Sequence, residues 1–211
     1  MTSNSHRPVH EQSSAESSFK LLYHLAEAEN WESILAHGLL STERLADLVG
    51  LPKREHAELL RSHRPRNPRL SRDILIRDQA PMPPYALMNA LDDGLQSADW
   101  YAVLNSFVFL RPDRDRMERQ RRACGTRSQI MLTFDAKALI EHFGTDDFVS
   151  PINSGDARRK PARRGLNTLL PYEQWRRGGW QTRSHAHPPA EFMFRCTLPV
   201  QAPYFLDAAA V

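Results

Sequence analysis

One stretch near the start of the chain, LLYHLAEAENWESILAHGLLS, constrains the fold more than any other. Residues 19–25 are a short, mostly apolar run that is typical of a strand. Asn30 then precedes a segment with Trp31 and Ile34 at helical spacing, and Gly38 follows it, as glycine often does after the last residue of a helix. The stretch therefore predicts a strand, a short helix with Asn30 as its N-cap, and a helix end at Gly38.

The rest of the chain shows helical patterns early and strand patterns late. Ser41 or Thr42 is the expected N-cap of the next helix, and three prolines between 81 and 84 predict a loop. Residues 72–77 fit either a strand or a helical turn. Residues 147–167 are expected to be one loop, longer than a simple connection needs. We expect helices over 42–50, 51–64, 97–104, 114–124 and 136–143, and strands over 107–110, 128–136 and 190–199.

This order of elements predicts an α+β fold in a single domain. The chain has 211 residues, of which 41% are hydrophobic, and this is enough for one sizeable core. Residues 1–18 carry almost nothing to bury and are expected to be disordered. We place the domain at 19–205 and expect 206–211 to be a tail.

Two observations bear on the compartment. There is no apolar run of membrane-spanning length, and the polar N-terminus lacks the apolar centre of a signal peptide. Cys124 and Cys196 are too few for a disulfide framework, so we expect a cytoplasmic protein without a membrane partner. His185 and His187 have metal-ligand spacing but no acidic or cysteine cluster beside them, and we expect no metal.

Arginine supplies nearly all the positive charge of a chain whose net charge is +3. The cluster at 111–122 is interleaved with acidic residues and is typical of a solvated helix with internal ion pairs. The cluster at 157–165 lies among proline and glycine and predicts a basic loop. Guanidinium groups match phosphate oxygens, so this loop is either a nucleic-acid contact or simply solvated.

Two residues far apart in the sequence are candidates for chemistry. His24 ends the first strand, and it is either a core histidine with a backbone partner or a ligand-binding residue. Glu191 opens the strand AEFMFRC, on which Phe192 and Phe194 share one face while Glu191 and Met193 share the other. Glu191 is either a solvated edge residue or a carboxylate held over a cleft. The common phosphate, dinucleotide, zinc-protease and serine-hydrolase motifs are absent.

The opening stretch LYHLAEAENWESILAHGLLS is similar to the first motif of the poly-ADP-ribose-polymerase-like branch of the ADP-ribosyltransferase superfamily. It resembles most the DarT-type toxins, which ADP-ribosylate DNA. HPPAEFMFRCTLPV resembles the final strand of that pattern, which carries the catalytic glutamate. NSFVFLRPDRDRM resembles its aromatic strand followed by Arg and Met, and PINSGDARR with LNTLLPYEQW resembles its Asn-rich loop. The run LIRDQAPM resembles an uncharacterised bacterial domain family.

The resemblance implies a split central β-sheet and a site for NAD as co-substrate. By this likeness Glu191 is the catalytic residue and His24, beside Tyr23, holds the nicotinamide-side ribose. Arg77 or Arg72 takes the place of the arginine that grips the NAD phosphates. The resemblance further assigns nicotinamide stacking to Phe107 or Phe109, NAD binding to Ser41, and acceptor binding to Asn153, Ser154, Arg158, Arg159, Arg163 and Arg164.

The implied function is transfer of ADP-ribose from NAD to a macromolecular acceptor, with nucleic acid favoured by the basic loop. Such a protein acts as a toxin or defence effector and is expected to have an antitoxin partner. Three alternatives stay open: an NAD glycohydrolase, an RNA 2′-phosphotransferase-like enzyme, and a catalytically silent domain that binds nucleic acid or protein.

Overall fold

The computed structural model describes residues 19–181, 183–184 and 187–211. Residues 1–18, for which disorder is predicted, lie outside these residues, and so does His185 of the His185–His187 pair. No helix in the described part of the chain combines the length and the apolar character needed to cross a membrane.

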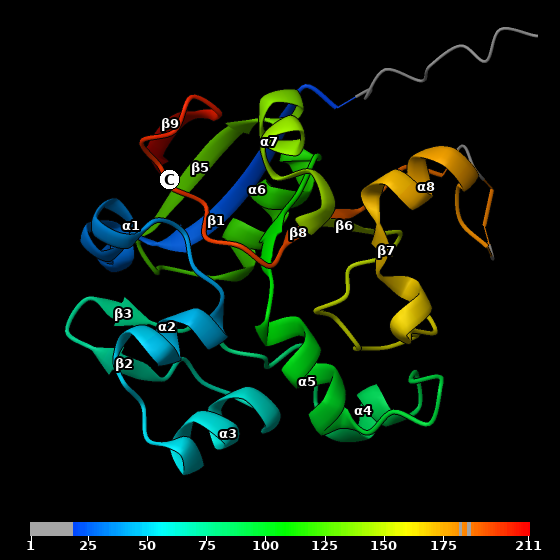
Figure 1. The fold of residues 1–211 in the computed structure, drawn as a ribbon. Helices are drawn as coiled ribbons and strands as arrows, with labels where there is room; N and C mark the ends of the chain where they lie inside the picture. The colour runs from blue at the N-terminus through cyan, green and yellow to red at the C-terminus, as the bar shows by residue number, and fades with distance from the viewer. Residues whose placement is uncertain (1–18, 182, 185–186) are drawn as a thin grey trace, which may run out of the picture.

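Two antiparallel sheets form the upper half of the molecule in Figure 1. Their strands are β1 (Leu21–Glu27), β4 (Val108–Leu110), β5 (Gln129–Asp135), β6 (Asp147–Ser150), β7 (Leu170–Pro171), β8 (Glu191–Phe194) and β9 (Phe205–Ala210). One sheet has the order β1-β5-β9 and the other the order β4-β8-β6-β7. Tyr23 on β1 and Arg111 after β4 join them, since each backbone N–H donates to the other residue's carbonyl at 2.8 Å.

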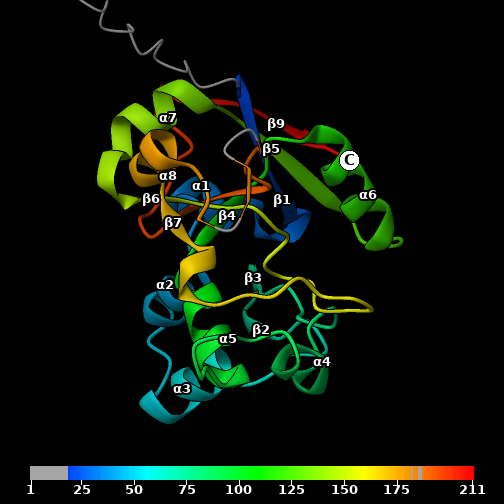
Figure 2. The same ribbon diagram turned by 90° about the vertical axis from the view of Figure 1, so that its right-hand side faces the viewer.

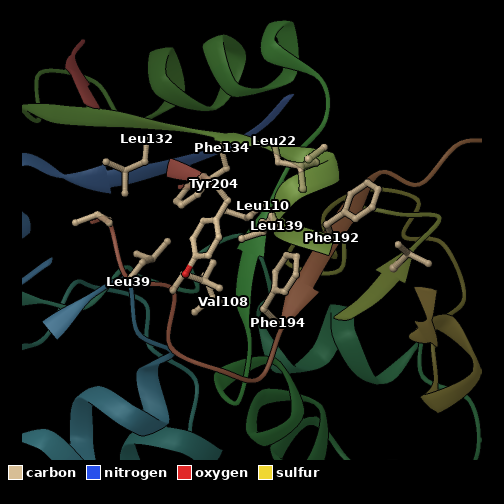
Figure 3. Packing of buried hydrophobic residues seen from close by; sticks show 14 of the residues in the cluster. Leu22, Leu39, Val108, Leu110, Leu132, Phe134, Leu139, Phe192, Phe194 and Tyr204 are labelled. Carbon is tan, nitrogen blue, oxygen red and sulfur yellow. The ribbon is translucent and has the colours of Figure 1, made fainter. Parts of the chain in front are cut away.

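The main core lies between these sheets and α7 (Ala136–Phe143), which adds Leu139 (Figure 3). Strand alternation sends every second side chain into it. The strand residues of this core include Leu22, Leu132 and Phe134 from the first sheet, and Val108, Leu110, Phe192 and Phe194 from the second. On β8 the predicted alternation is confirmed, because Met193 belongs instead to a second cluster with Trp100 and Tyr101.

The helices and one hairpin fill the remaining volume. Figure 1 shows α2, α3, α4, α5 and the hairpin of β2 and β3 below the sheets, and α6 and α7 beside them. Their bounds are α1 (Trp31–His37), α2 (Thr42–Leu48), α3 (Lys53–Arg61), β2 (Arg69–Ser71), β3 (Ile74–Leu75), α4 (Pro84–Met88), α5 (Ser97–Asn105), α6 (Arg114–Ala123) and α8 (Tyr172–Gly178), with short 3-10 turns at Ala28–Asn30, Gly144–Asp146 and Leu166–Thr168. The predicted mixture of helices and antiparallel strands in one chain is thus confirmed.

The helix ends follow the sequence signals with two differences. Gly38 ends α1 with φ at +79°, and the Ser41 hydroxyl accepts the Arg44 N–H at the start of α2. Asn30 does not cap α1 with its side chain; its amide instead exchanges two 2.8 Å hydrogen bonds with the backbone of Leu75 on β3. At α5 the N-cap is Gln96 rather than Ser97.

Three segments differ from expectation. The predicted long loop begins with a strand, β6, which pairs with β8. Residues 206–210, expected to lie in a tail, form most of β9 and pair with β5. The proline-rich segment starts a helix at Pro84, where the missing N–H of proline costs nothing.

Candidate active site

A cavity of about 840 Å³ lies between the sheets and the helices below them. Its wall contains His24 from β1 and Glu191 from β8, together with residues of the hairpin, α6 and the segment after β6. Figure 2 shows that segment, in yellow, running between the strands and the lower helices. The two residues singled out at opposite ends of the sequence therefore face one space.

Glu191 is held by an arginine that the sequence alone did not single out. Leu110 pairs with Phe192 in the antiparallel register of β4 and β8, so the next position brings Arg111 opposite Glu191. The Arg111 Nη2 donates to Glu191 Oε1 at 3.0 Å and to Asn153 Oδ1 at 3.1 Å. Glu191 is only 1% exposed, which rules out a solvated edge residue.

The second carboxylate oxygen of Glu191 is held by the loop that follows β6. Both the backbone N–H and the hydroxyl of Ser154 donate to Glu191 Oε2, at 2.9 and 2.6 Å. The Ser154 carbonyl in turn accepts from the Trp100 indole and from Arg164, at 3.3 and 3.0 Å. Because these partners come from α5 and from the loop itself, the orientation of the carboxylate is fixed before any ligand binds.

His24 has one nitrogen engaged and one available. Its Nδ1 lies 2.8 Å from the Phe109 carbonyl, which can only accept, so Nδ1 carries the proton. Burial lowers the pKa of His24 to about 4; the Phe109 carbonyl opposes this, and the nearby charges of Arg77 and Arg111 add to it. The ring is therefore neutral at pH 7, with Nε2 as a hydrogen-bond acceptor.

Tyr23, beside His24, points to the other face of β1. Its side chain is buried in a small cluster with Leu25, Met117 and Met131, and its backbone forms the bridge to Arg111. Tyr23 thus helps to position both His24 and Arg111.

Of the two candidate arginines, Arg77 lines the cavity and Arg72 does not. Arg77 is engaged within the protein, since its Nη2 lies 3.2 Å from Glu27 Oε1 and its Nη1 lies 3.8 Å from the Cys124 sulfur. Arg127 contacts the same Glu27 oxygen at 3.2 Å. Arg77 therefore belongs to an ion-pair network with Glu27 and Arg127 in the cavity wall.

The two aromatic candidates differ in surroundings, although both reach the cavity. Phe107 is 4% exposed, and the Arg195 guanidinium lies 4.8 Å from its ring centroid. Phe109 is half-buried and bonds to His24 through its carbonyl, so it is the better placed of the two for contact with a ligand. Ser41 lines the same cavity while it caps α2.

Residues 20–204 match the model of the family described as "Family of unknown function (DUF7002)". The chain belongs to this family. The match spans every residue of the cavity wall, from Tyr23 to Glu191. No curated protein and no solved structure is significantly similar to the chain.

The basic loop of this DUF7002 chain is less open than its sequence suggests. Arg164 is 1% exposed and donates to the carbonyls of Ser154, Asp156 and Ala162, so it holds the loop and does not face an acceptor. Arg163 pairs with Asp92. The expectation of a solvated or phosphate-facing Arg164 is therefore wrong, because the side chain is buried and each of its three nitrogens donates to the loop.

Two further arginines of the loop remain at the surface. Arg158 pairs with Asp156 at 2.8 Å and lines both the main cavity and a smaller one of about 250 Å³. Arg159 and the exposed Tyr85 line the smaller cavity. In the described part of the chain, no group of three or more histidine, cysteine or acidic residues is arranged to hold a metal ion.

Arg111 is the functional candidate that sequence reasoning missed. It lies two residues after Phe109, so strand alternation places it on the same face. The resemblance of NSFVFLRPDRDRM includes an arginine after the aromatic strand but gives it no role, and it is the pairing of β4 with β8 that sets Arg111 beside Glu191.

Proposed function

We propose that the DUF7002 chain is an ADP-ribosyltransferase that uses NAD, and that its two joined sheets correspond to the split sheet of that superfamily. The observation that carries the proposal is that His24 and Glu191, 167 positions apart in the sequence, face one cavity. The similarity of the motifs around both residues to the DarT type supports it.

The residues of the cavity fit a dinucleotide. The neutral His24 ring offers an acceptor at Nε2 for a ribose hydroxyl. Phe109 offers a half-buried ring for stacking, and Ser41 lies in the same wall. Tyr23 contributes through its backbone bridge to Arg111. NAD, when bound, supplies an N-glycosidic bond whose cleavage leaves positive charge on the ribose.

Glu191 is the group that acts on that charge. Its carboxylate stabilises the cationic ribose electrostatically, and it takes the proton from the acceptor as the new glycosidic bond forms. Arg111 and Ser154 are positioning residues, because their three hydrogen bonds fix the orientation of the carboxylate. Asn153, which also bonds to Arg111, lies at the edge of this arrangement.

The acceptor in this proposal is a nucleic acid in the cytoplasm, with an antitoxin as a second partner. Arg158 and Arg159 support this choice, since they lie at the surface where the two cavities adjoin. Arg163 lies further along the same loop with its guanidinium exposed beside Asp92.

The decisive measurement is nicotinamide release from NAD by wild-type protein and by Glu191→Gln. We expect release by the wild type and a loss of at least a hundredfold in the variant, because a neutral amide does not stabilise the cation. Glu27→Gln is the matched control, since Glu27 is also buried in the cavity wall and paired with arginines. Equal turnover by wild type and Glu191→Gln would sink the proposal.

Labelled NAD separates the alternatives. Label on an added oligonucleotide indicates transfer, and label only on free ADP-ribose indicates a glycohydrolase. Release of ADP-ribose cyclic phosphate from a 2′-phosphorylated RNA indicates the phosphotransferase. Binding of nucleic acid without any turnover of NAD indicates the silent domain.

A further inference from the structure

Arg64 is a buried cation in the wall of the cavity. It is 9% exposed and lies just after α3, where it contacts the end of α5. Its Nη1 donates to the Leu59 carbonyl at 2.7 Å and its Nη2 donates to Asn105 Oδ1 at 2.9 Å. The Asn105 amide is fixed in turn by the Leu60 carbonyl at 2.8 Å. The guanidinium is thus held rigidly in place.

No carboxylate contacts Arg64 within the described residues, in contrast to the other enclosed arginines of the cavity. Arg77 pairs with Glu27, Arg111 with Glu191, and Arg127 with both Glu27 and Asp78. Asp78 is near enough for its charge to act on Arg64, but its contact goes to Arg127.

The hydrogen bonds of Arg64 leave most of its donors unused. A guanidinium has five N–H donors, and the two acceptors that it contacts are neutral. Its Nε has no partner in the described part of the structure. Burial lowers the pKa of Arg64 to about 10, so the group stays charged at pH 7.

The cavity wall as a whole has an excess of positive charge. Its arginines are Arg64, Arg77, Arg111, Arg116, Arg119, Arg127 and Arg158, and its carboxylates are Glu27, Asp78, Asp156 and Glu191. Burying a cation without a counter-ion is costly, so a fold that keeps one in a cavity wall favours an anionic ligand.

A purely structural role explains only part of this arrangement. The carbonyl of Leu59 and the side chain of Asn105 lie near the C-terminal ends of α3 and α5, where the helix dipoles favour a cation. These partners tie the two helices together. They are neutral, so they do not provide a counter-ion for the guanidinium.

We propose that Arg64 forms the phosphate subsite of the cavity and binds the pyrophosphate of the dinucleotide, in place of Arg77. The inference rests on the proposed function for the identity of the ligand. It assigns the role to a residue just after α3, ahead of Arg72 and Arg77, the two arginines to which the resemblance gives it. Arg77 is less suited to this role because its Nη2 already contacts the Glu27 carboxylate and its Nη1 lies near the Cys124 sulfur.

The test uses inorganic pyrophosphate as the probe and NMR of arginine Nε–H groups as the readout. In wild-type protein, pyrophosphate should shift the Arg64 Nε–H resonance, which is assigned by its absence from Arg64→Lys. The titration itself uses wild-type protein, and the assignment needs only a variant that keeps the positive charge. A titration that leaves this resonance in place while it shifts the one from Arg77 overturns the inference.

Affinities for pyrophosphate in matched variants give the second arm. Arg64→Met should weaken pyrophosphate binding about tenfold to a hundredfold, because it removes a charge-assisted hydrogen bond. Arg64→Lys keeps the charge and should weaken binding less. Arg119→Met removes one charge from the same wall at an exposed position and should change affinity less than threefold. Equal losses in Arg64→Met and Arg119→Met would show a general charge effect and overturn the inference.

The same proteins are also assayed for nicotinamide release from NAD. The two assays together distinguish a failure of this inference from a failure of the proposed function. Turnover of NAD with no effect of pyrophosphate on Arg64 overturns this inference and leaves the proposed function standing. Pyrophosphate binding that depends on Arg64, without turnover of NAD, retains the anion subsite and overturns the proposed function.

Discussion

At the scale of single residues, the site is built from pairs that strand geometry creates. Glu191 and Arg111 lie opposite each other because β4 and β8 are antiparallel in a fixed register. The face of Glu191 follows from the alternation of AEFMFRC and was predictable. Its partner was not, because the sequence contains several arginines near the end of β4 and gives no information on which strand pairs with which.

The pairing of Arg111 with Glu191 leads to a prediction about stability. The Arg111 side chain is 15% exposed and the Glu191 side chain 1% exposed, so removing either one leaves the other as an uncompensated buried charge. Arg111→Met and Glu191→Met should therefore each lower the free energy of unfolding by about 3 kcal/mol. The double variant should lose less than the sum of the single losses by about 1–3 kcal/mol. Urea unfolding of the four proteins measures this coupling, and strictly additive losses would contradict it.

At the scale of elements, the segments that sequence predicted well are those whose own side chains decide their structure. Gly38, Ser41 and Gly144 end or begin helices where their conformational and capping preferences indicate. β6 and β9 were missed because partners from elsewhere in the chain create them. β9 reads FLDAAA, a weak strand former, and it is a strand because its backbone pairs with the strongly apolar β5.

β9 therefore supports the sheet and not the cavity. Truncation after Tyr204 should lower the free energy of unfolding by roughly 1–3 kcal/mol, because β5 loses its pairing and Phe134 loses the ring contact with Phe205. No residue of the cavity wall belongs to β9. At a temperature where the truncated and full-length proteins are both folded, we expect the two to release nicotinamide at the same rate. A loss of turnover without a loss of stability would show that β9 has a role in the site.

At the scale of the whole molecule, two buried ionisable groups act on stability in opposite directions. The lowered pKa of His24, about 4, means that the unfolded chain binds a proton that the folded chain does not, so stability falls as pH drops from 6.5 towards 4. Asp147 is 1% exposed, and neither carboxylate oxygen is hydrogen-bonded to another described residue. Burial, with the nearby charges of Glu173 and Asp146, raises its pKa from 3.8 to about 7. Here the folded chain holds the extra proton, and stability falls as pH rises from about 4 to about 7.

Asp147→Asn separates the two effects. Wild type and variant both contain His24, so its contribution cancels in the difference between their free energies of unfolding. The free energies of unfolding should agree near pH 4. Above pH 7 the variant should be more stable by about 4 kcal/mol, the cost of ionising a carboxyl group whose pKa is raised by about three units. Urea unfolding at intervals from pH 4 to pH 8.5 measures this difference. Glu173→Gln is the control and should recover only a small part of it, since burial is the larger cause of the shift. A difference that stays constant across this range would mean that Asp147 does not titrate there and that solvent or another protein group satisfies its charge.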